Sequence, residues 1–425
     1  MQINVNEITS MVDDQIHTIV SGLPPYSQLN IRLKTALPWC PSIQFSSYAN
    51  YIADSSGTVD LDTAAPIDGT YEHANPMGLV YSLQVTAPLH QDISANISVD
   101  HPMIFHFTFE TDTQAETLQI IRLFKTDDII ATPIRNPFNG RLFHNGDSSR
   151  KTILMFGGSD GQMEALSLLA APLASRGFNV LVIPYFGTED LPEKLEMVPL
   201  EYFEKVFHWI ETSTLTQTGD IYLHGTSKGG ELALLLASRY PQVKKVVAVE
   251  GHTYCFQALD GLMSGSPVSS WSYGGDSIPF IPVDNSIFFE ELKKDVENNV
   301  PFGFTSTYKR SIERAANREE ARIKIENASA DLLLICGKSD NIWNSYDGCL
   351  EILLAAKSHD YDRTVKLLAY EDMGHPLLIP YVLPIALTLQ MPMYGGIFTS
   401  GGTVEGNGNA QYDSWKETIA FFQAS

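Results

Sequence analysis

Residues 220–231 constrain the fold of this chain more than any other stretch. The apolar residues 221–223 are typical of the end of a buried strand, and Gly-Thr-Ser-Lys-Gly follows at 225–229. An apolar run at 232–237 then predicts a helix. A strand that turns sharply into a helix at Gly-x-Ser-x-Gly forms a nucleophile elbow, in which the serine occupies a strained turn and its neighbours must lack bulk. Ser227 is therefore the candidate nucleophile.

A serine hydroxyl becomes a useful nucleophile only when a base removes its proton and a carboxylate orients that base. Where the nucleophile sits in a strand–elbow–helix unit, the acid follows the serine in the chain and the histidine comes last. Asp340 follows the apolar strand expected at 332–336, so we predict that it is the acid. Asp347 is the nearest alternative, although we expect it to lie in the next helix.

His375 is the candidate base, because it follows the last expected strand (365–369) and Gly374 permits a tight approach. His359 lies in a charged stretch and is expected to be exposed to solvent. His224 and His252 precede the acid and break the order, although His252 stays a candidate for the wall of the pocket.

Two backbone amides are needed to hold the oxyanion. We predict that Lys228, the residue after the nucleophile, supplies one of them. The other comes from the loop after the strand at 153–156, from Ser159 or Asp160. We interpret the Lys228 side chain as an exposed residue at the start of a helix. The glycine-rich loop lacks the Gly-Lys-Ser/Thr ending of a nucleotide-binding loop.

The first part of the chain has the pattern of an all-β domain. Short runs rich in β-branched and aromatic residues are separated by turn signals, which predicts an immunoglobulin-like β-sandwich over residues 1–140. A linker is expected at 133–149, where Pro, Gly and polar residues accumulate. The expected strands are 16–20, 29–33, 45–53, 58–61, 79–86 and 104–109.

Residues 141–425 alternate between apolar strands and helices, which predicts a mostly parallel, doubly wound sheet of the α/β-hydrolase type. The alternation lapses at about 252–330, where we expect an inserted lid and pocket wall. Its second part, 309–324, is basic and is predicted to be helical. The glycine-rich stretch 395–408 is interpreted as a loop before a final helix at 415–423. Further strands are expected at 180–183 and 246–249, and further helices at 163–174 and 200–210.

The formal charge of −22 argues against binding to nucleic acid or to an anionic membrane surface. No signal-peptide pattern and no apolar run of membrane-spanning length is visible, so we predict a cytoplasmic protein. The four cysteines show no paired spacing and are expected to be reduced thiols. No metal or organic cofactor is implied.

Taken together, these motifs resemble the acyl-CoA thioesterase and bile acid-CoA:amino acid N-acyltransferase family over almost the whole chain. The most specific stretch is Tyr-Phe-Gly-Thr-Glu-Asp-Leu-Pro at 185–192. Departures are Lys338-Ser339 before Asp340, where relatives often carry an additional acid, and 407–410, which replaces a segment that often contains histidine. The likeness also rests on 21–25, 75–79, 200–203, 225–232, 343–345, 374–375, 380–381, 401–403 and 410–415.

The resemblance implies hydrolysis of acyl-CoA to free acid and CoA through an acyl-enzyme on Ser227. In this family the members that conjugate amino acids carry Cys at the elbow, so Ser227 favours water over an amine as acceptor. Relatives carry more basic residues near the CoA phosphates than this acidic chain does. The densest candidates here are Lys309, Arg310, Arg314, Arg318 and Arg322. Alternatives are a serine carboxylesterase acting on small oxygen esters, an acyl-CoA:amino acid N-acyltransferase and a noncatalytic binding protein.

Overall fold

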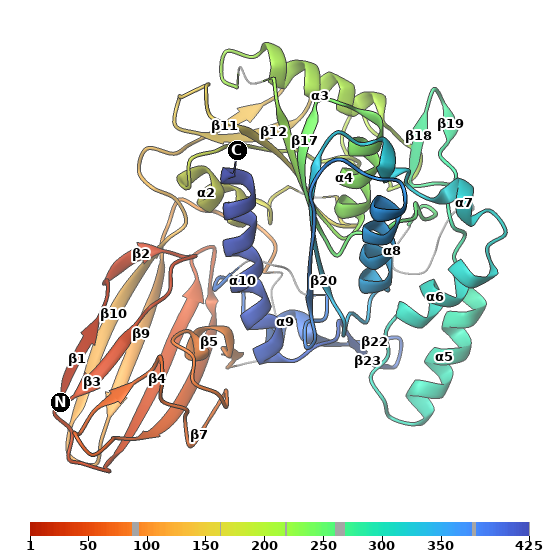
Figure 1. The fold of residues 1–425 in the computed structure, drawn as a ribbon. Coiled ribbons are helices and arrows are strands. Elements are labelled where there is room, and N and C mark those ends of the chain that lie inside the picture. Colours follow the sequence, from red (N-terminus) through yellow and green to blue (C-terminus); the bar gives the residue numbers. More distant parts are fainter. Residues whose placement is uncertain (87–92, 162, 217–218, 260–267, 376–379, 425) are drawn as a thin grey trace. The chain divides into compact units, whose positions relative to one another are not determined.

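The computed structural model describes residues 1–86, 93–161, 163–216, 219–259, 268–375 and 380–424 (Figure 1). The chain divides into two compact units. Unit 1 comprises residues 1–126, 376–390 and 403–413, and unit 2 comprises 127–375, 391–402 and 414–425. The predicted domain division at 140/141 stays a prediction. Among the described residues, no helix combines the length and the apolar character that a bilayer crossing requires.

Unit 1 is built from β-sheets. Its main sheet has the strand order β2-β10-β9-β4-β5-β7, with β8 also paired to β5, and a second sheet has the order β1-β3-β6. Buried and exposed residues alternate along β4 and β9, as expected for a sheet with one face in a core. The strands are β1 Gln2–Val5, β2 Thr9–Met11, β3 Thr18–Ser21, β4 Gln28–Leu37, β5 Cys40–Ile52, β6 Val59–Asp60, β7 Asp68–Gly69, β8 Gln84–Val85, β9 Met103–Glu110 and β10 Ala115–Leu123, and the short helices are α1 Gly78–Tyr81 and α9 Ala386–Leu389.

Unit 2 contains an eight-stranded sheet of order β11-β12-β14-β13-β16-β17-β20-β21. The strands from β14 to β21 pair in parallel, whereas β12 is antiparallel to both of its neighbours. This is the predicted α/β-hydrolase sheet. The central strands are apolar along their whole length because helices cover both faces of such a sheet. The strands are β11 Ile130–Ile134, β12 Gly140–His144, β13 Thr152–Phe156, β14 Asn179–Val182, β16 Ile221–Thr226, β17 Val243–Val249, β20 Asp331–Gly337 and β21 Val365–Tyr370.

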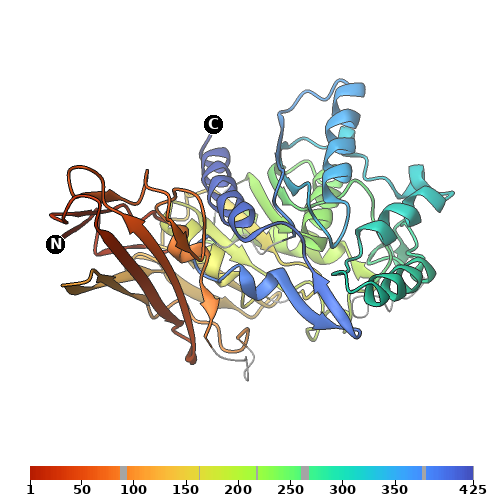
Figure 2. The ribbon, with the colours of Figure 1, turned by 90° about the horizontal axis from the view of Figure 1, so that it is seen from below.

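Helices connect the parallel strands, and Figure 1 shows α4 and α8 beside β17 and β20. The segment at 252–330, where the alternation was expected to lapse, adds α5 and α6, which pack side by side (Figure 2). The helices are α2 Ser167–Ser175, α3 Glu201–Thr212, α4 Lys228–Arg239, α5 Asn285–Glu297, α6 Thr305–Arg314, α7 Arg318–Ala321, the 3₁₀ helix η1 Ile325–Asn327, α8 Ser345–Ser358 and α10 Val404–Gln423. Small strands complete the unit: β15 Val198–Pro199, β18 Trp271–Tyr273, β19 Asp276–Ser277, β22 Gln390–Met393 and β23 Gly396–Thr399.

Two predictions for the first 150 residues were wrong. The expected linker at 133–149 contains β12 and the end of β11, and Pro133 pairs with Arg141. A proline is tolerated there because β11 is an edge strand of the sheet. The expected strand at 79–86 begins as helix α1, because the Asn75 side chain accepts a hydrogen bond from the Met77 amide and starts a helical turn.

A further prediction failed at the final helix. This helix begins at Val404 rather than at 415, because the Thr403 hydroxyl accepts a hydrogen bond from the Gly406 amide and caps the first turn. The basic stretch 309–324 is helical over the end of α6 and over α7, as predicted, and residues 315–317 and 322–324 lie outside these helices. All four cysteines are buried free thiols, as predicted.

Candidate active site

The turn between β16 and α4 has the conformation that the predicted elbow requires. Ser227 has φ 56° and ψ −119°, a backbone conformation that a residue with a side chain seldom adopts. Its amide donates to the carbonyl of Val249 at 2.8 Å, which ties the turn to the neighbouring strand β17. A Cβ atom on Gly225 would lie 2.0 Å from the Gly229 carbonyl oxygen, so the close backbone approach needs glycine.

The loop after β13 lies next to Ser227. A Cβ atom on Gly158 would be 3.6 Å from the Ser227 Cβ, and Tyr185 donates from its hydroxyl to the Gly157 carbonyl at 3.2 Å. Ser159 and Asp160 line the same pocket as Ser227 and Lys228. The amides of Lys228 and of Ser159 or Asp160 stay our predicted oxyanion donors, and the first amides of α4 begin at Lys228.

The Lys228 side chain is buried, so the prediction that it is exposed was wrong. Its Nζ lies 2.7 Å from each carboxylate oxygen of Glu231, one helical turn later. Glu231 also accepts from the Trp271 indole at 2.6 Å and from the Phe256 amide at 3.3 Å. Burial raises the pKa of Glu231, and the contact with Lys228 opposes that shift. A buried ammonium group survives here because a fully bonded carboxylate neutralises it.

Asp340 and His375 come together although 35 residues separate them in the chain. His375 Nδ1 lies 2.9 Å from Asp340 Oδ2. The other Asp340 oxygen accepts from the amides of Ile342 at 2.9 Å and Trp343 at 3.2 Å, and the Ser345 hydroxyl donates to Oδ2 at 2.5 Å. The loop between β20 and α8 thus holds the carboxylate in one orientation, with one oxygen facing the imidazole.

The carbonyl of Ser400 bonds to both the loop that carries Asp340 and the loop that carries His375, and so fixes their separation. It accepts from the His375 amide at 2.9 Å and from the Asn341 amide at 3.1 Å, next to Asp340. Gly401 has φ +88°, and a Cβ atom there would lie 1.9 Å from the Ser339 carbonyl oxygen. The segment after β23 therefore connects the loop of the acid to the loop of the histidine through backbone bonds.

The alternative residues lie elsewhere. Asp347 is in the first turn of α8, and its carboxylate pairs with Lys309 at 3.1 Å. The His359 side chain is 47% exposed, as predicted. His224 is buried within β16. His252 is buried against the Phe256 and Trp343 rings, and it is absent from the described lining of the pocket beside Ser227.

Glu250 is the residue of this site that sequence analysis missed. It follows β17 directly with φ 52°, and its Oε2 lies 3.2 Å from His375 Nε2. Burial raises the pKa of Glu250. Burial alone would lower the pKa of His375, but the charges of Asp340 and Glu250 together raise it. An acid directly after the predicted strand 246–249, at the carboxyl edge of the sheet, is the signal that could have identified it.

A pocket of about 200 Å³ opens beside Ser227. One end is polar, with Ser159, Asp160 and Lys228. The remaining wall is apolar and largely aromatic. Leu259, Phe304 and Tyr308 come from the 252–330 segment, and Ile342 and Trp343 follow the Asp340 loop. In the part of the chain that the structure describes, Ser227 Oγ makes no hydrogen bond to His375, and no cluster of three His, Cys, Asp or Glu side chains suits a metal ion.

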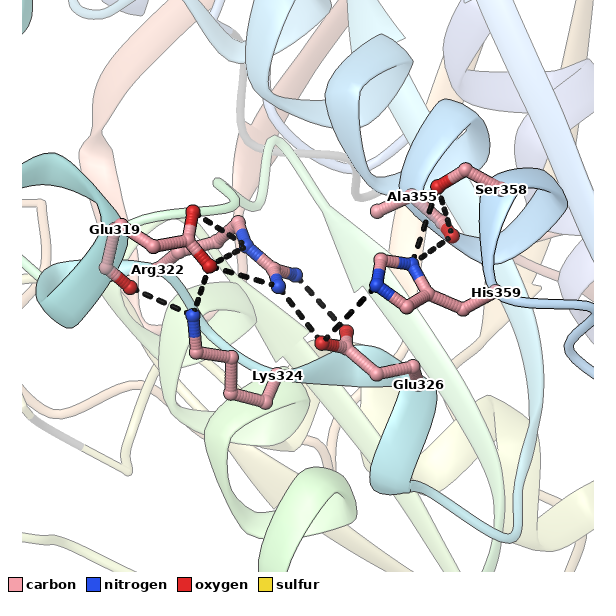
Figure 3. Close-up of polar contacts among 7 residues, drawn as sticks. All are labelled: Glu319, Arg322, Lys324, Glu326, Ala355, Ser358 and His359. Atoms are coloured by element: carbon pink, nitrogen blue, oxygen red, sulfur yellow. Dashed lines mark hydrogen bonds and ion pairs between the residues drawn. The ribbon is translucent and has the colours of Figure 1, made fainter.

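Four of the five basic residues proposed for phosphate binding contact acidic side chains. Arg310 contacts Glu291 at 3.1 Å, and Arg314 contacts Asp284 at 2.5 Å. Figure 3 shows Arg322 between two carboxylates, with Glu319 at 3.2 Å and Glu326 at 2.7 Å. Lys309 is occupied by Asp347, as described above. Nearby carboxylates of this acidic chain thus neutralise these cations.

Comparisons with known proteins find two family models and several relatives that match this chain. The family model described as BAAT / Acyl-CoA thioester hydrolase C terminal matches residues 198–425, and the model of the acyl-CoA thioester hydrolase/BAAT N-terminal region matches 13–136. Human acyl-coenzyme A thioesterase 1 is 24% identical, covering 96% of this chain and 93% of that protein. Mouse bile acid-CoA:amino acid N-acyltransferase is 27% identical over 98% of this chain and 96% of that protein. Human mitochondrial acyl-coenzyme A thioesterase 2 is 24% identical, with 96% of this chain and 81% of that protein covered.

Proposed function

Because this chain belongs to the acyl-CoA thioester hydrolase/BAAT family, we propose that it hydrolyses acyl-CoA to free acid and CoA through an acyl-enzyme on Ser227. The observation that carries the proposal is the 2.9 Å contact between His375 Nδ1 and Asp340 Oδ2, in the same unit as the strained serine elbow. Such a contact orients the imidazole so that its other nitrogen, Nε2, is the atom that would exchange the proton, and this nitrogen lies 3.2 Å from Glu250 Oε2.

In this mechanism His375 takes the hydroxyl proton as Ser227 Oγ attacks the thioester carbonyl. The C–S bond then breaks and the thiol leaves, so the acyl group stays on Ser227. Water attacks the acyl-enzyme with His375 as base, and the regenerated serine completes the cycle. Asp340 orients the imidazole and stabilises its protonated form. The Lys228 amide, with that of Ser159 or Asp160, holds each oxyanion.

The aromatic part of the pocket is the proposed site for the acyl chain. Phe304, Tyr308 and Trp343 offer apolar surface next to the nucleophile, and their size limits the space to about 200 Å³. We propose that these aromatic side chains set the length of acyl chain that the site accepts. Phe304→Ala should extend the accepted chain length.

A serine esterase acting on small oxygen esters is the second candidate function. The ion pairs of Lys309, Arg310, Arg314 and Arg322 favour it, because cations that already contact carboxylates are poorer partners for the CoA phosphates. An uncharged ester would not need them. Compartment is a further proposal: we place the protein in the cytoplasm, although some relatives are named mitochondrial.

A matched panel separates these functions. Acyl-CoA thioesters, uncharged thioesters and nitrophenyl esters with the same acyl group should be compared by kcat/KM. The proposal requires acyl-CoA to be the best substrate, and a higher kcat/KM for uncharged esters would favour the esterase. Labelling of Ser227 by a fluorophosphonate tests the nucleophile, with Ser227→Ala as control. An unlabelled, inactive protein would favour a binding role.

The acceptor needs its own test, because the relatives include N-acyltransferases. We propose water as the acceptor, since the acyl-enzyme on Ser227 is an oxygen ester, which is less reactive toward amines relative to water than a thioester is. Millimolar glycine or taurine should leave the free acid as product, and mass spectrometry detects any amide. Ser227→Cys should slow hydrolysis and allow some amide. A dominant amide product from the unmodified protein would refute the hydrolase proposal.

A further inference from the structure

The carboxyl group of Glu250 is unusual because it is buried without ordinary partners. Its backbone is well bonded: the amide donates to Ile335 at 2.6 Å, and the carbonyl accepts from the Trp343 indole at 2.8 Å. Within the described residues, however, neither carboxyl oxygen receives a hydrogen bond. The nearest cationic group is His375, whose Nε2 lies 3.2 Å from Oε2. Glu250 is fully buried, so its carboxyl group is not exposed to bulk solvent.

An arrangement of this kind is costly to keep. Burying an acid without full hydrogen bonding is unfavourable, because the group loses its hydration without gaining donors. The left-handed backbone of Glu250, at φ 52°, adds strain. The contact of the carboxyl group is with the catalytic candidate His375 and does not offset the burial of the acid. The geometry therefore indicates a role in the reaction.

We propose that Glu250 is a positioning residue that holds His375 between two carboxyl groups. This arrangement makes the site selective for acyl compounds whose leaving group departs as a stable anion, so that thioesters are preferred over alkyl esters. The inference rests on the proposed serine hydrolase function and names the class of bond that the site prefers. Asp340 contacts Nδ1 of the imidazole and Glu250 lies at Nε2, so each ring nitrogen faces an acid.

The chemical reason lies in the breakdown of the first tetrahedral intermediate. When Oγ of Ser227 bonds to the acyl carbon, its proton moves to Nε2 of His375. Breaking the C–S or C–O bond then leaves its electron pair on the leaving atom. A thiolate is stable near neutral pH because thiols ionise at about 8.5, whereas an alkoxide must be protonated because hydroxyl groups ionise near about 16. An imidazolium between two carboxyl groups keeps its proton more firmly, which penalises the departure of an alkoxide and spares that of a thiolate. The departed thiolate then takes this proton and becomes the thiol, so that neutral His375 can act as base toward water.

The same pairing affects the pH dependence. His375 acts as a base only after it loses its proton, and Asp340 and Glu250 both favour the protonated form. The activity should therefore rise at a higher pH than for an ordinary histidine. The Cys349 thiol interacts with Cys336 and with the charges of Asp340 and Glu250, and the His252 imidazole packs on the Trp343 ring, which also contacts His375. Burial keeps His252 neutral by lowering its pKa to about 3, while the interaction with Cys336, together with burial, raises the pKa of the Cys349 thiol.

The test is Glu250→Gln, which keeps the size of the side chain and removes its acid function. The matched control is Glu371→Gln, since Glu371 is 74% exposed and precedes His375 by four residues. Three substrates with one acyl group are used: S-ethyl thiobutyrate, ethyl butyrate and nitrophenyl butyrate. The readout is kcat/KM between pH 5 and 10, because this quantity covers the steps up to release of the leaving group and excludes deacylation.

In Glu250→Gln the rise of kcat/KM should move to lower pH by about one to two units. The preference for the thioester over ethyl butyrate should fall by about tenfold, corresponding to one unit in the acidity of the imidazolium. Glu371→Gln should change neither. A folded Glu250→Gln protein with an unchanged pH profile and an unchanged substrate preference would overturn the inference.

Two further measurements distinguish a failure of the Glu250 inference from a variant that does not fold and from a failure of the hydrolase function. If Glu250→Gln does not fold, the unmodified protein is tested with a series of thiol, phenol and alcohol esters of butyric acid. The inference requires kcat/KM to fall steeply as the leaving group becomes more basic, and a flat series would overturn it. Failure of the hydrolase function itself looks different: the unmodified protein would neither turn over nitrophenyl butyrate nor react with a fluorophosphonate at Ser227.

Discussion

Two glutamates are completely buried in unit 2, and their surroundings are opposite. Glu231 receives the ammonium of Lys228 on both oxygens, together with an indole and an amide donor. The carboxyl group of Glu250 receives no hydrogen bond from the described residues, and His375 Nε2 lies 3.2 Å from its Oε2. Both follow the ends of parallel strands, and burial raises the pKa of both. Burial alone therefore does not distinguish a structural acid from a functional one.

Glu231 and Glu250 differ in the groups that contact their carboxyl oxygens. The carboxylate of Glu231 is neutralised within its own helix, so its bonds hold α4 in place behind Ser227 and are complete without a ligand. Among the described residues, the cationic partner of the Glu250 carboxyl group is the His375 imidazole, which must gain and lose a proton during the proposed reaction. A buried acid with saturated bonds stabilises a fold, whereas one with open bonds next to a base indicates chemistry.

The contrast between Glu231 and Glu250 depends on His375 being the catalytic base, so this assignment is tested first. We expect Ser227→Ala, Asp340→Asn and His375→Ala each to lower kcat/KM by about 10³-fold or more, because the three groups act as one unit. Thermal unfolding should show that each variant stays folded. Near-normal turnover by Asp340→Asn would transfer the role of the acid to another carboxylate, and Asp347→Asn serves as its control.

The free energy of unfolding provides a second test of the contrast between Glu231 and Glu250. Glu231→Ala leaves the Lys228 ammonium buried without a partner, so we expect a loss of about 3–5 kcal/mol in the free energy of unfolding. Glu250→Gln removes an acid that has no donors, and its cost should stay below about 1 kcal/mol. Urea unfolding at neutral pH compares the two. Equal losses would mean that Glu250 has a structural role like that of Glu231.

A third carboxylate provides a reference near the surface. Glu326 pairs with Arg322, and hydrogen bonding to that guanidinium lowers the pKa of the acid to about 2 (Figure 3). A depressed pKa in the folded state means that the stabilisation is present above the ordinary value of 4.5 and is lost as the pH falls toward about 2. Glu326→Gln should therefore cost up to about 1 kcal/mol at pH 7. This difference should disappear in unfolding experiments near pH 2.

The smallest effect is expected at the paired cations. Arg310→Gln and Arg314→Gln should change KM for acyl-CoA by less than about twofold, because each guanidinium is already matched by an exposed or half-buried acid. An uncharged thioester is the control substrate. A selective rise of tenfold or more with acyl-CoA would show that these cations leave their acids to bind phosphates.

The sheet and the elbow could be predicted because their signals are local. Each central strand is a continuous apolar run, and Gly225 and Gly229 mark a turn in which backbone atoms come close. The order of Ser227, Asp340 and His375 follows from the sequence of parallel strands, each of which ends at the same edge of the sheet. These features need no knowledge of distant contacts.

The errors arose where a distant or competing partner decides the outcome. Lys228 was expected at the surface because lysine usually is, and only Glu231 and the Trp271 indole, 40 residues farther along, explain its burial. Likewise, the linker prediction failed because proline at an edge strand resembles proline in a loop. Glu250 was overlooked since its significance depends on His375, which is 125 positions away and meets it only in the folded sheet.

The bond from Ser400 to the loops of Asp340 and His375 has a consequence for how the protein is made. During synthesis the chain emerges from the N-terminus, and the nucleophile, the acid and the base all precede residue 376. The carbonyl that spaces the acid and the base comes 25 residues after the histidine and is supplied by the strand β23 segment. A nascent chain can thus build its eight-stranded sheet before Ser400 has been made, and the proposed arrangement of acid and base is complete only after residue 400 has been translated.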